Sequence, residues 1–235
     1  MFPCCCKCFT KTSADAERQP LSARTIGPYS KAAYGTDSLE TARDTTVKKG
    51  KVNAKLVGVP DIDHLFTDIG DTFNKQHQHC LEISEYIRQV NESYKCPPNS
   101  SFSVCLQKIK EKHRDLEINV QMQGYSFMLE VQPEGAHEKL LHTQQQIKNL
   151  SLATKSVLAA GTTLQEMINY VLQKEEELTD RVKKMDLAYQ DKVRVESNLK
   201  ENLQEVRRTK QLSVQYRETA NQVLAEMAQL ADITI

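Results

Sequence analysis

The sequence predicts an all-α protein in which an antiparallel helical hairpin and a long coiled-coil helix follow a disordered N-terminal tail. Leu, Glu, Lys, Gln and Arg, which are strong helix formers, crowd the second half of the chain. Glycine and proline, which interrupt helices, number only 8 and 7 among 235 residues. Apolar residues also recur in alternating steps of four and three from Ile62 onward, the spacing of a coiled-coil core. We therefore expect a tail at 1–60, a hairpin at 61–132 and a coiled-coil region at 133–235.

Residues 1–60 show no sustained hydrophobic period, and Ser, Thr, Ala, Gly and charged residues dominate them, so we expect a disordered spacer. Ten Lys and Arg stand against five Asp and Glu, which gives this segment a net charge of +5 in a chain that is neutral overall. That charge suits an anionic membrane surface and is too dilute to indicate nucleic-acid binding. Lys55–Pro60, KLVGVP, is a short apolar patch that we expect to dock on the helices behind it.

Four of the seven cysteines, Cys4, Cys5, Cys6 and Cys8, lie within the first ten residues. Disulfides are disfavoured because neighbouring cysteines are poorly placed to bridge one another and cytosolic thiols stay reduced. A zinc site is disfavoured because the thiols are not in loop-separated pairs and the nearest histidine is His64. Incidental cysteines on a tail remain an alternative, although exposed free thiols are a liability that chains tend to avoid.

S-acylation is the interpretation that the cysteine cluster favours. One fatty chain binds a membrane only marginally, whereas several adjacent sites add their buried methylenes together. Lys7 and Lys11 would add attraction to anionic lipid. Because residue 2 is Phe, myristoylation of an N-terminal glycine is excluded.

Over about a dozen residues, this start resembles the cysteine-rich starts of acylated neuronal growth-cone and synaptic scaffold proteins. The resemblance implies a lipid anchor. The sequence has no apolar run of roughly 18 residues for a membrane span and no secretory signal. We therefore expect a peripheral, lipid-anchored protein on the cytosolic face of the plasma membrane, the Golgi or endolysosomal vesicles.

The first helix is expected to begin at Pro60–Asp61 and to end at Cys96-Pro97-Pro98. Its core positions are Ile62, Phe66, Ile69, Phe73, Gln76, Cys80, Ile83, Ile87, Val90 and Tyr94. A second helix, from about Asn99–Ser101 to Pro133, has core positions Phe102, Leu106, Ile109, His113, Leu116, Val120, Gln123 and Phe127. The tight Pro-Pro turn between two helices of equal length predicts an antiparallel hairpin. Within it Gln76, His113 and Gln123 are candidate polar layers that set register and partner. For His113 the alternative is a core histidine with satisfied hydrogen bonds, and either interpretation is favoured over a catalyst.

After Pro133 a helix resumes, and we favour a break at Gly161 over a helix that runs through it. Beyond Gly161 heptad-like spacing continues to Leu230, which predicts a helix of nearly 70 residues and about 100 Å. A domain of this size would not bury that length alone. We therefore expect it to pack on a coiled-coil partner or on a second copy of the chain.

No residue pattern indicates an enzyme or a cofactor. The sequence has no glycine-rich phosphate loop, no GxSxG and no HExxH. His77 and His79 are two residues apart on a helix and point about 200° apart, so they do not share a metal ion. Cys80 already belongs to the core pattern, so we expect no metal site there.

Two further resemblances concern the helices. Gln76 within a heptad run is similar to the central glutamine layer of SNARE helices, although the layers here stop about five steps later. Lys184-Met185-Asp186-Leu187 resembles a short signature of small coiled-coil subunits in lysosome-positioning complexes, which is an analogy of architecture.

The C-terminus ends in Ile233-Thr234-Ile235. An extended apolar-x-apolar tail with a free carboxylate can add a strand to a PDZ domain, with Ile235 in the apolar pocket and Ile233 in the second site. The favoured alternative is that both isoleucines pack as a last apolar turn of the coiled coil.

The leading hypothesis is a non-enzymatic, S-acylated coiled-coil adaptor that recruits or assembles with other coiled-coil proteins on a membrane. The first alternative is a SNARE-like membrane-fusion component. The second is a cytoskeletal or ciliary coiled-coil protein without membrane contact.

Overall fold

The computed structural model describes residues 50–97, 100–132 and 137–231. Most of these residues are helical, which confirms the predominantly helical fold class. The elements in chain order are α2 (Pro60–Ser93), α3 (Phe102–Lys112), β1 (Glu117–Gln123), β2 (Ser126–Gln132), α4 (Glu138–Gln173), α5 (Glu175–Lys183) and α6 (Tyr189–Leu230).

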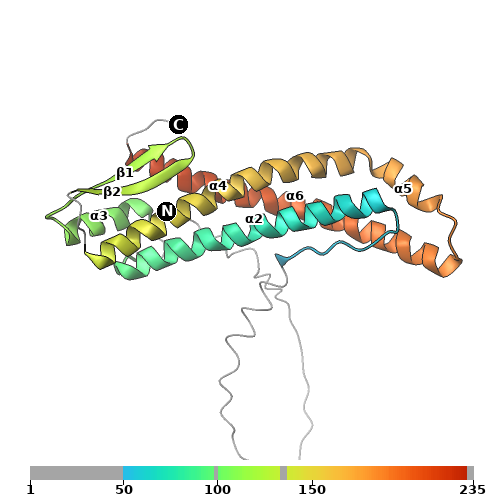
Figure 1. Ribbon diagram of the computed structural model, residues 1–235, viewed down its shortest axis with the longest axis horizontal. Coiled ribbons are helices and arrows are strands. Elements are labelled where there is room, and N and C mark those ends of the chain that lie inside the picture. The colour runs from blue at the N-terminus through green and yellow to red at the C-terminus, as the bar shows by residue number, and fades with distance from the viewer. Residues whose placement is uncertain (1–49, 98–99, 133–136, 232–235) are drawn as a thin grey trace, which may run out of the picture. The chain divides into compact units, whose positions relative to one another are not determined.

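The three long helices α2, α4 and α6 pack side by side, and α4 runs opposite to the other two (Figure 1). Two hydrophobic clusters fill the space between them. One joins the C-terminal halves of α2 and α6 to α3, the two strands and the first half of α4. The other joins the beginnings of α2 and α6 to the end of α4, to α5 and to residues 52–57.

The predicted core of α2 is confirmed. Of the predicted positions, Ile87 alone is only partly buried. The others are buried and follow the expected steps: Ile62, Phe66, Ile69, Phe73, Gln76, Cys80, Ile83, Val90 and Tyr94. Pro60 opens the helix at its first turn, where its missing N–H costs no hydrogen bond. Lys95, with φ of 51°, follows the helix in the left-handed conformation that commonly ends one.

The second helix is much shorter than predicted, so the expected helical hairpin over 61–132 is wrong. Helix α3 ends at Lys112, and the chain then forms an antiparallel pair in which Val120 lies opposite Leu129. Gly124, with φ of 57°, begins the two-residue turn between Gln123 and Ser126. A glycine at the first turn position is typical of the turns that match strand twist.

The predicted break at Gly161 is also wrong, because α4 runs through it. A Cβ built on Gly161 would lie 2.6 Å from Gln76 Nε2 and 2.6 Å from the Arg217 side chain. Glycine thus leaves room on α4 for the Gln76 side chain of α2 and the Arg217 side chain of α6, and it does not bend the helix.

The single helix of nearly 70 residues does not form. It is interrupted after Gln173 and again between Lys183 and Tyr189, where the chain reverses so that α6 packs on α4 and α2. The apolar seam that we expected to need a partner is buried within the chain itself: Leu178, Val182, Val195, Leu199, Leu203, Val206, Val223, Leu224 and Met227.

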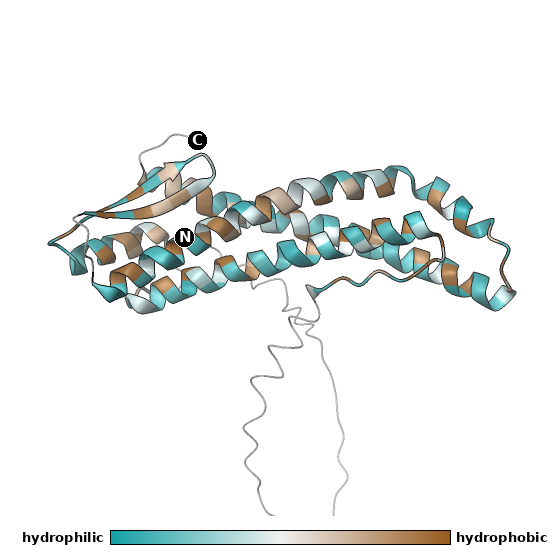
Figure 2. Ribbon diagram, in the orientation of Figure 1, coloured by the Kyte–Doolittle hydropathy of each residue, from teal (hydrophilic) through white to brown (hydrophobic). Residues whose placement is uncertain are grey.

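Apolar and polar residues alternate along the long helices (Figure 2). Among the residues described, none of the helices is both long and apolar enough to span a bilayer.

Candidate functional site: a clamp on residues 51–58

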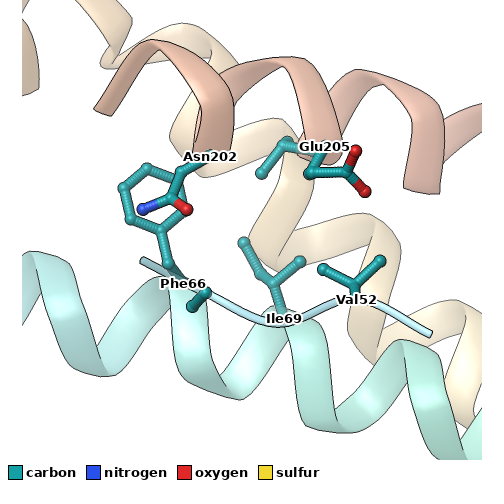
Figure 3. Close-up of a pocket in the computed structure, with 7 residues that line it drawn as sticks. Val52, Phe66, Ile69, Asn202 and Glu205 are labelled. Atoms are coloured by element: carbon teal, nitrogen blue, oxygen red, sulfur yellow. The ribbon is translucent and has the colours of Figure 1, made fainter. Parts of the chain in front are cut away.

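Residues 51–58, which we call the strap, lead from the N-terminal tail to α2 and lie between α2 and α6 (Figure 3). The strap has no helix or strand pairing of its own. Its Val52 and Val57 side chains are buried in the second hydrophobic cluster. The expectation that the apolar patch docks on the helices behind it is therefore confirmed.

Two asparagines, one from each flanking helix, hold the strap main chain. The Val52 N–H donates to Asn74 Oδ1 at 2.8 Å, and Asn74 Nδ2 donates to the Val52 carbonyl oxygen at 2.9 Å. The Lys55 N–H donates to Asn202 Oδ1 at 2.9 Å, and Asn202 Nδ2 donates to the Lys55 carbonyl oxygen at 2.7 Å. Each amide thus satisfies both polar groups of one residue, as a neighbouring strand would.

The second half of the strap has further partners. Asn198 Nδ2 donates to the Leu56 carbonyl oxygen at 2.7 Å. Asp63, in the first turn of α2, accepts from the Val57 N–H at 2.7 Å and from the Gly58 N–H at 3.1 Å. Gly58 has φ of 77°, a left-handed conformation that favours glycine where the strap turns into α2.

The strap also fits closely against apolar side chains. Figure 3 shows Val52 beside Ile69 of α2, and Asn202 of α6 next to Phe66 of α2. The cavity that these residues line has a volume of about 10 Å³, no more than the space of one water molecule. A Cβ on Gly70 would lie 3.3 Å from the Val52 carbonyl oxygen, so glycine allows the close approach.

This arrangement binds an extended main chain and offers no reacting group. One ion pair, Lys55 Nζ to Glu201 at 2.5 Å, is exposed on both sides and adds little stability. The contacts fix the strap main chain to both α2 and α6.

The predicted site residues fall into two groups. Cys4, Cys5, Cys6, Cys8, Lys7, Lys11, Ile233 and Ile235 lie outside the described residues. Of the three candidate polar-layer residues, Gln76 is fully buried, and its Nε2 donates to the Val157 carbonyl oxygen of α4 at 3.2 Å. Its Oε1 is buried and has no hydrogen-bond partner among the residues that the structure describes.

The other two candidates do not lie in helical layers. His113 follows α3 and is buried, with Nε2 3.4 Å from the Tyr94 hydroxyl. Gln123 is the exposed last residue of β1. The placement of Gln123 in a helical core was wrong, because the chain at this point has the two-residue period of a strand.

Next to Gln76, His77 lies against α6. Its Nδ1 is 2.8 Å from the Tyr216 hydroxyl, and its ring stacks on Phe73 at a centroid distance of 6.2 Å. Burial lowers the pKa of His77, and the positive charges of Arg208 and Lys51 lower it further. The imidazole is therefore neutral at pH 7.

The described residues contain no group of three or more His, Cys, Asp or Glu that could hold a metal ion.

The sequence interpretation missed Asn74 and Asn202. Both are polar residues within helical patterns, and their only signal was indirect: an extended apolar segment before α2 needs hydrogen-bond partners.

No protein-family model, curated protein or solved structure matches this chain.

Proposed function

We propose that the chain is a non-enzymatic adaptor held on the cytosolic face of a membrane by fatty chains on Cys4, Cys5, Cys6 and Cys8. The observation that carries the proposal is the presence of four cysteines within the first ten residues, with Lys7 and Lys11 between and after them. Several acyl chains bind a bilayer far more stably than one.

The strap supports the tethering part of the proposal. A tail that ended on a single helix could peel that helix from the bundle under load. Here the main chain is bound through Asn74 of α2 and through Asn202 of α6, so both helices resist displacement of the tail. A tether needs such a firm attachment at the folded end.

The adaptor part needs an exposed surface, because the apolar seam of α6 is buried within the chain. Leu141 and Leu152 lie three turns apart on one face of α4 and are 54% and 58% exposed. We expect a partner helix to contact these two residues. Met128 of β2 is also exposed, at 55%, but it alternates with the buried Phe127 and Leu129 and so lies on the opposite face of the strand pair.

The SNARE-like alternative is less well supported. A fusion helix presents its central glutamine to helices of other chains, whereas Gln76 is bonded to Val157 of its own chain. The cytoskeletal or ciliary alternative is a structural coiled-coil protein without membrane contact.

Membrane fractionation separates the anchored adaptor from the alternative without membrane contact. The variant with all four N-terminal cysteines changed to Ser should move from the membrane pellet to the soluble fraction, with an unchanged melting temperature. Single substitutions should have smaller effects, because the remaining sites still supply several chains. The matched control is Cys96→Ser, since Cys96 is a partly exposed cysteine of the folded part. A fourfold variant that stays in the pellet would rule out acylation as the anchor.

A further inference from the structure

Four lysines come together where α2 ends and α4 begins, around Tyr94. Tyr94 is buried, and its hydroxyl lies 3.4 Å from His113 Nε2 and accepts a hydrogen bond from Thr143 Oγ1 at 3.3 Å. The ring is therefore fixed. Lys139 Nζ lies 4.7 Å from the ring centroid and Lys112 Nζ lies 5.8 Å from it. Two ammonium groups thus share one aromatic side chain.

The part of the chain that the structure describes supplies no ion-pair partner to this cluster. Among the described residues, no carboxylate lies within 4.0 Å of Lys95, Lys108, Lys112 or Lys139. Burial lowers the pKa of Lys139, and the neighbouring ammonium groups of Lys112 and Lys95 lower it further. Like charges held this close raise the energy of the folded chain unless an anion joins them.

Capping of α2 explains only part of the cluster. Lys139 Nζ donates to the Ser93 carbonyl oxygen, and Lys108 Nζ donates to the Lys95 carbonyl oxygen at 2.8 Å. Cations are favourable at a helix C-terminus, so these two lysines have a structural role. Lys112 has no such acceptor among the described residues, yet it lies beside Lys139.

We propose that Lys95, Lys112 and Lys139 bind a phosphate monoester, carried by a lipid headgroup or by a free polyphosphorylated metabolite. A phosphate dianion matches two adjacent ammonium groups in charge, and lysine is a common phosphate ligand. Lys139 lies in the first turn of α4, whose N-cap residue His137 makes no capping side-chain hydrogen bond. The positive end of that helix dipole favours the same anion. The site does not depend on the acyl anchor.

Calorimetry with inositol hexakisphosphate tests the site on the full-length chain made without acylation. Changing Lys112 and Lys139 together to Gln should weaken binding roughly tenfold or more, which is about 1.4 kcal/mol. The matched control changes Lys110 and Lys155 to Gln, which removes the same charge. Lys110 lies on the same helix as Lys112, but its Nζ is 3.4 Å from Asn119 Oδ1. The control should bind within twofold of the unmodified chain.

A second arm separates the two phosphate sources. Vesicles of phosphatidylcholine with a phosphoinositide, compared with phosphatidylcholine alone, should retain the unacylated chain if the phosphate is a lipid headgroup. Binding of inositol hexakisphosphate without retention on either kind of vesicle would assign a soluble ligand.

If the double variant fails to fold, NMR spectra of the unmodified chain still test the proposal. Inositol hexakisphosphate should shift the NMR signals of Tyr94, Lys112 and Lys139. The arginine pair Lys112→Arg and Lys139→Arg should keep binding. No binding in either arm, or equal loss in the double variant and its control, would overturn the proposal.

Discussion

Asn74 and Asn202 give the strap main chain the hydrogen bonds that a neighbouring β-strand would otherwise supply. An extended segment buried against helices exposes N–H and C=O groups that have no ladder partner, and each unsatisfied group costs free energy. A primary amide carries a donor and an acceptor side by side, so it satisfies both groups of one residue. Alanine would keep the helix and lose both bonds.

Asn202→Ala should therefore lower the free energy of unfolding by about 1–3 kcal/mol, the cost of leaving buried polar groups unsatisfied. It should also speed amide hydrogen exchange of Lys55, whose N–H donates to Asn202. Urea unfolding and hydrogen exchange measured by mass spectrometry check the two effects.

Asn198→Ala is the control for that change. Asn198 makes one exposed hydrogen bond to the strap, where Asn202 makes two partly buried ones. Its removal should cost a few tenths of a kcal/mol. Equal effects of the two substitutions would show that the paired amide bonds do not hold the strap.

We expect His77 to make the stability of the fold depend on pH. Its folded-state pKa is lowered by burial, then by Arg208 and Lys51, from an ordinary value of 6.5. Between the lowered pKa and 6.5 the unfolded chain binds more protons, so stability is complete above about pH 6.5 and falls as the pH drops through the lowered pKa. Burial, His137 and Lys112 lower the pKa of His113, which acts in the same direction.

The urea midpoint should accordingly be lower at pH 5.5 than at pH 7.5. The decrease should be smaller in His77→Gln, whose side chain does not titrate. Glu226 acts in the opposite direction, because burial raises its pKa, but it is common to both proteins. An identical pH dependence in the two proteins would show that His77 is not responsible.

At the scale of elements, α2 was predictable because one period described it. Its apolar positions follow steps of four and three from Ile62 to Val90, Pro60 opens it and Pro97 follows it. The pair β1 and β2 was missed because Val120 and Phe127 fit both a helical and a strand period. The distinguishing signals were the strict alternation of Ile118, Val120 and Met122 and the glycine at 124.

The turn between α5 and α6 had no sequence signal of the usual kind. It contains neither glycine nor proline, and Met185 and Leu187 pack partly buried against the second cluster. Tertiary burial therefore outweighs the helix propensity of this stretch. The local sequence does not reveal this burial, because the cluster that covers Met185 and Leu187 contains residues of the strap and α2, which are distant in the chain.

Because α6 packs on its own chain, a substitution at Leu199 should affect the stability of the fold. In a coiled-coil seam exposed to a partner, the same substitution would abolish only the binding of that partner. Leu199 is 3% exposed within this chain. Leu199→Glu should destabilise the fold by about 3 kcal/mol or more, because an unpaired charge is buried. Thermal unfolding followed by circular dichroism measures this.

Lys200→Glu is the neighbouring control, since Lys200 is exposed on the same helix. It should leave the melting temperature nearly unchanged. If Leu199→Glu also left it unchanged and abolished only the binding of a partner, the intramolecular packing of α6 would be contradicted.

At the scale of the molecule, the helical part and the N-terminal cysteines rest on different observations. The helical part follows from packing, and the contacts of the strap with α2 and α6 are visible only in the three-dimensional structure. The proposed anchor residues Cys4, Cys5, Cys6 and Cys8 rest on the sequence alone, because acylation requires cysteines near a membrane and no fold. The described residues do not include them.

The strap predicts where truncation becomes harmful. Deletion of residues 1–49 should leave the melting temperature unchanged, because it spares Val52 and Val57. Deletion of residues 1–59 should lower it by several degrees, since two buried side chains and the bonds to both asparagines are lost. Equal melting temperatures for the two deletions would show that the strap does not stabilise the helices.

The central claim is that fatty chains on the N-terminal cysteines anchor the protein. Mass spectrometry of the intact N-terminal peptide from cells, with and without hydroxylamine, tests it most directly because hydroxylamine cleaves thioesters. We predict two or more fatty acyl groups on Cys4, Cys5, Cys6 and Cys8, all removed by hydroxylamine. Four free thiols on the membrane-bound protein would contradict the account.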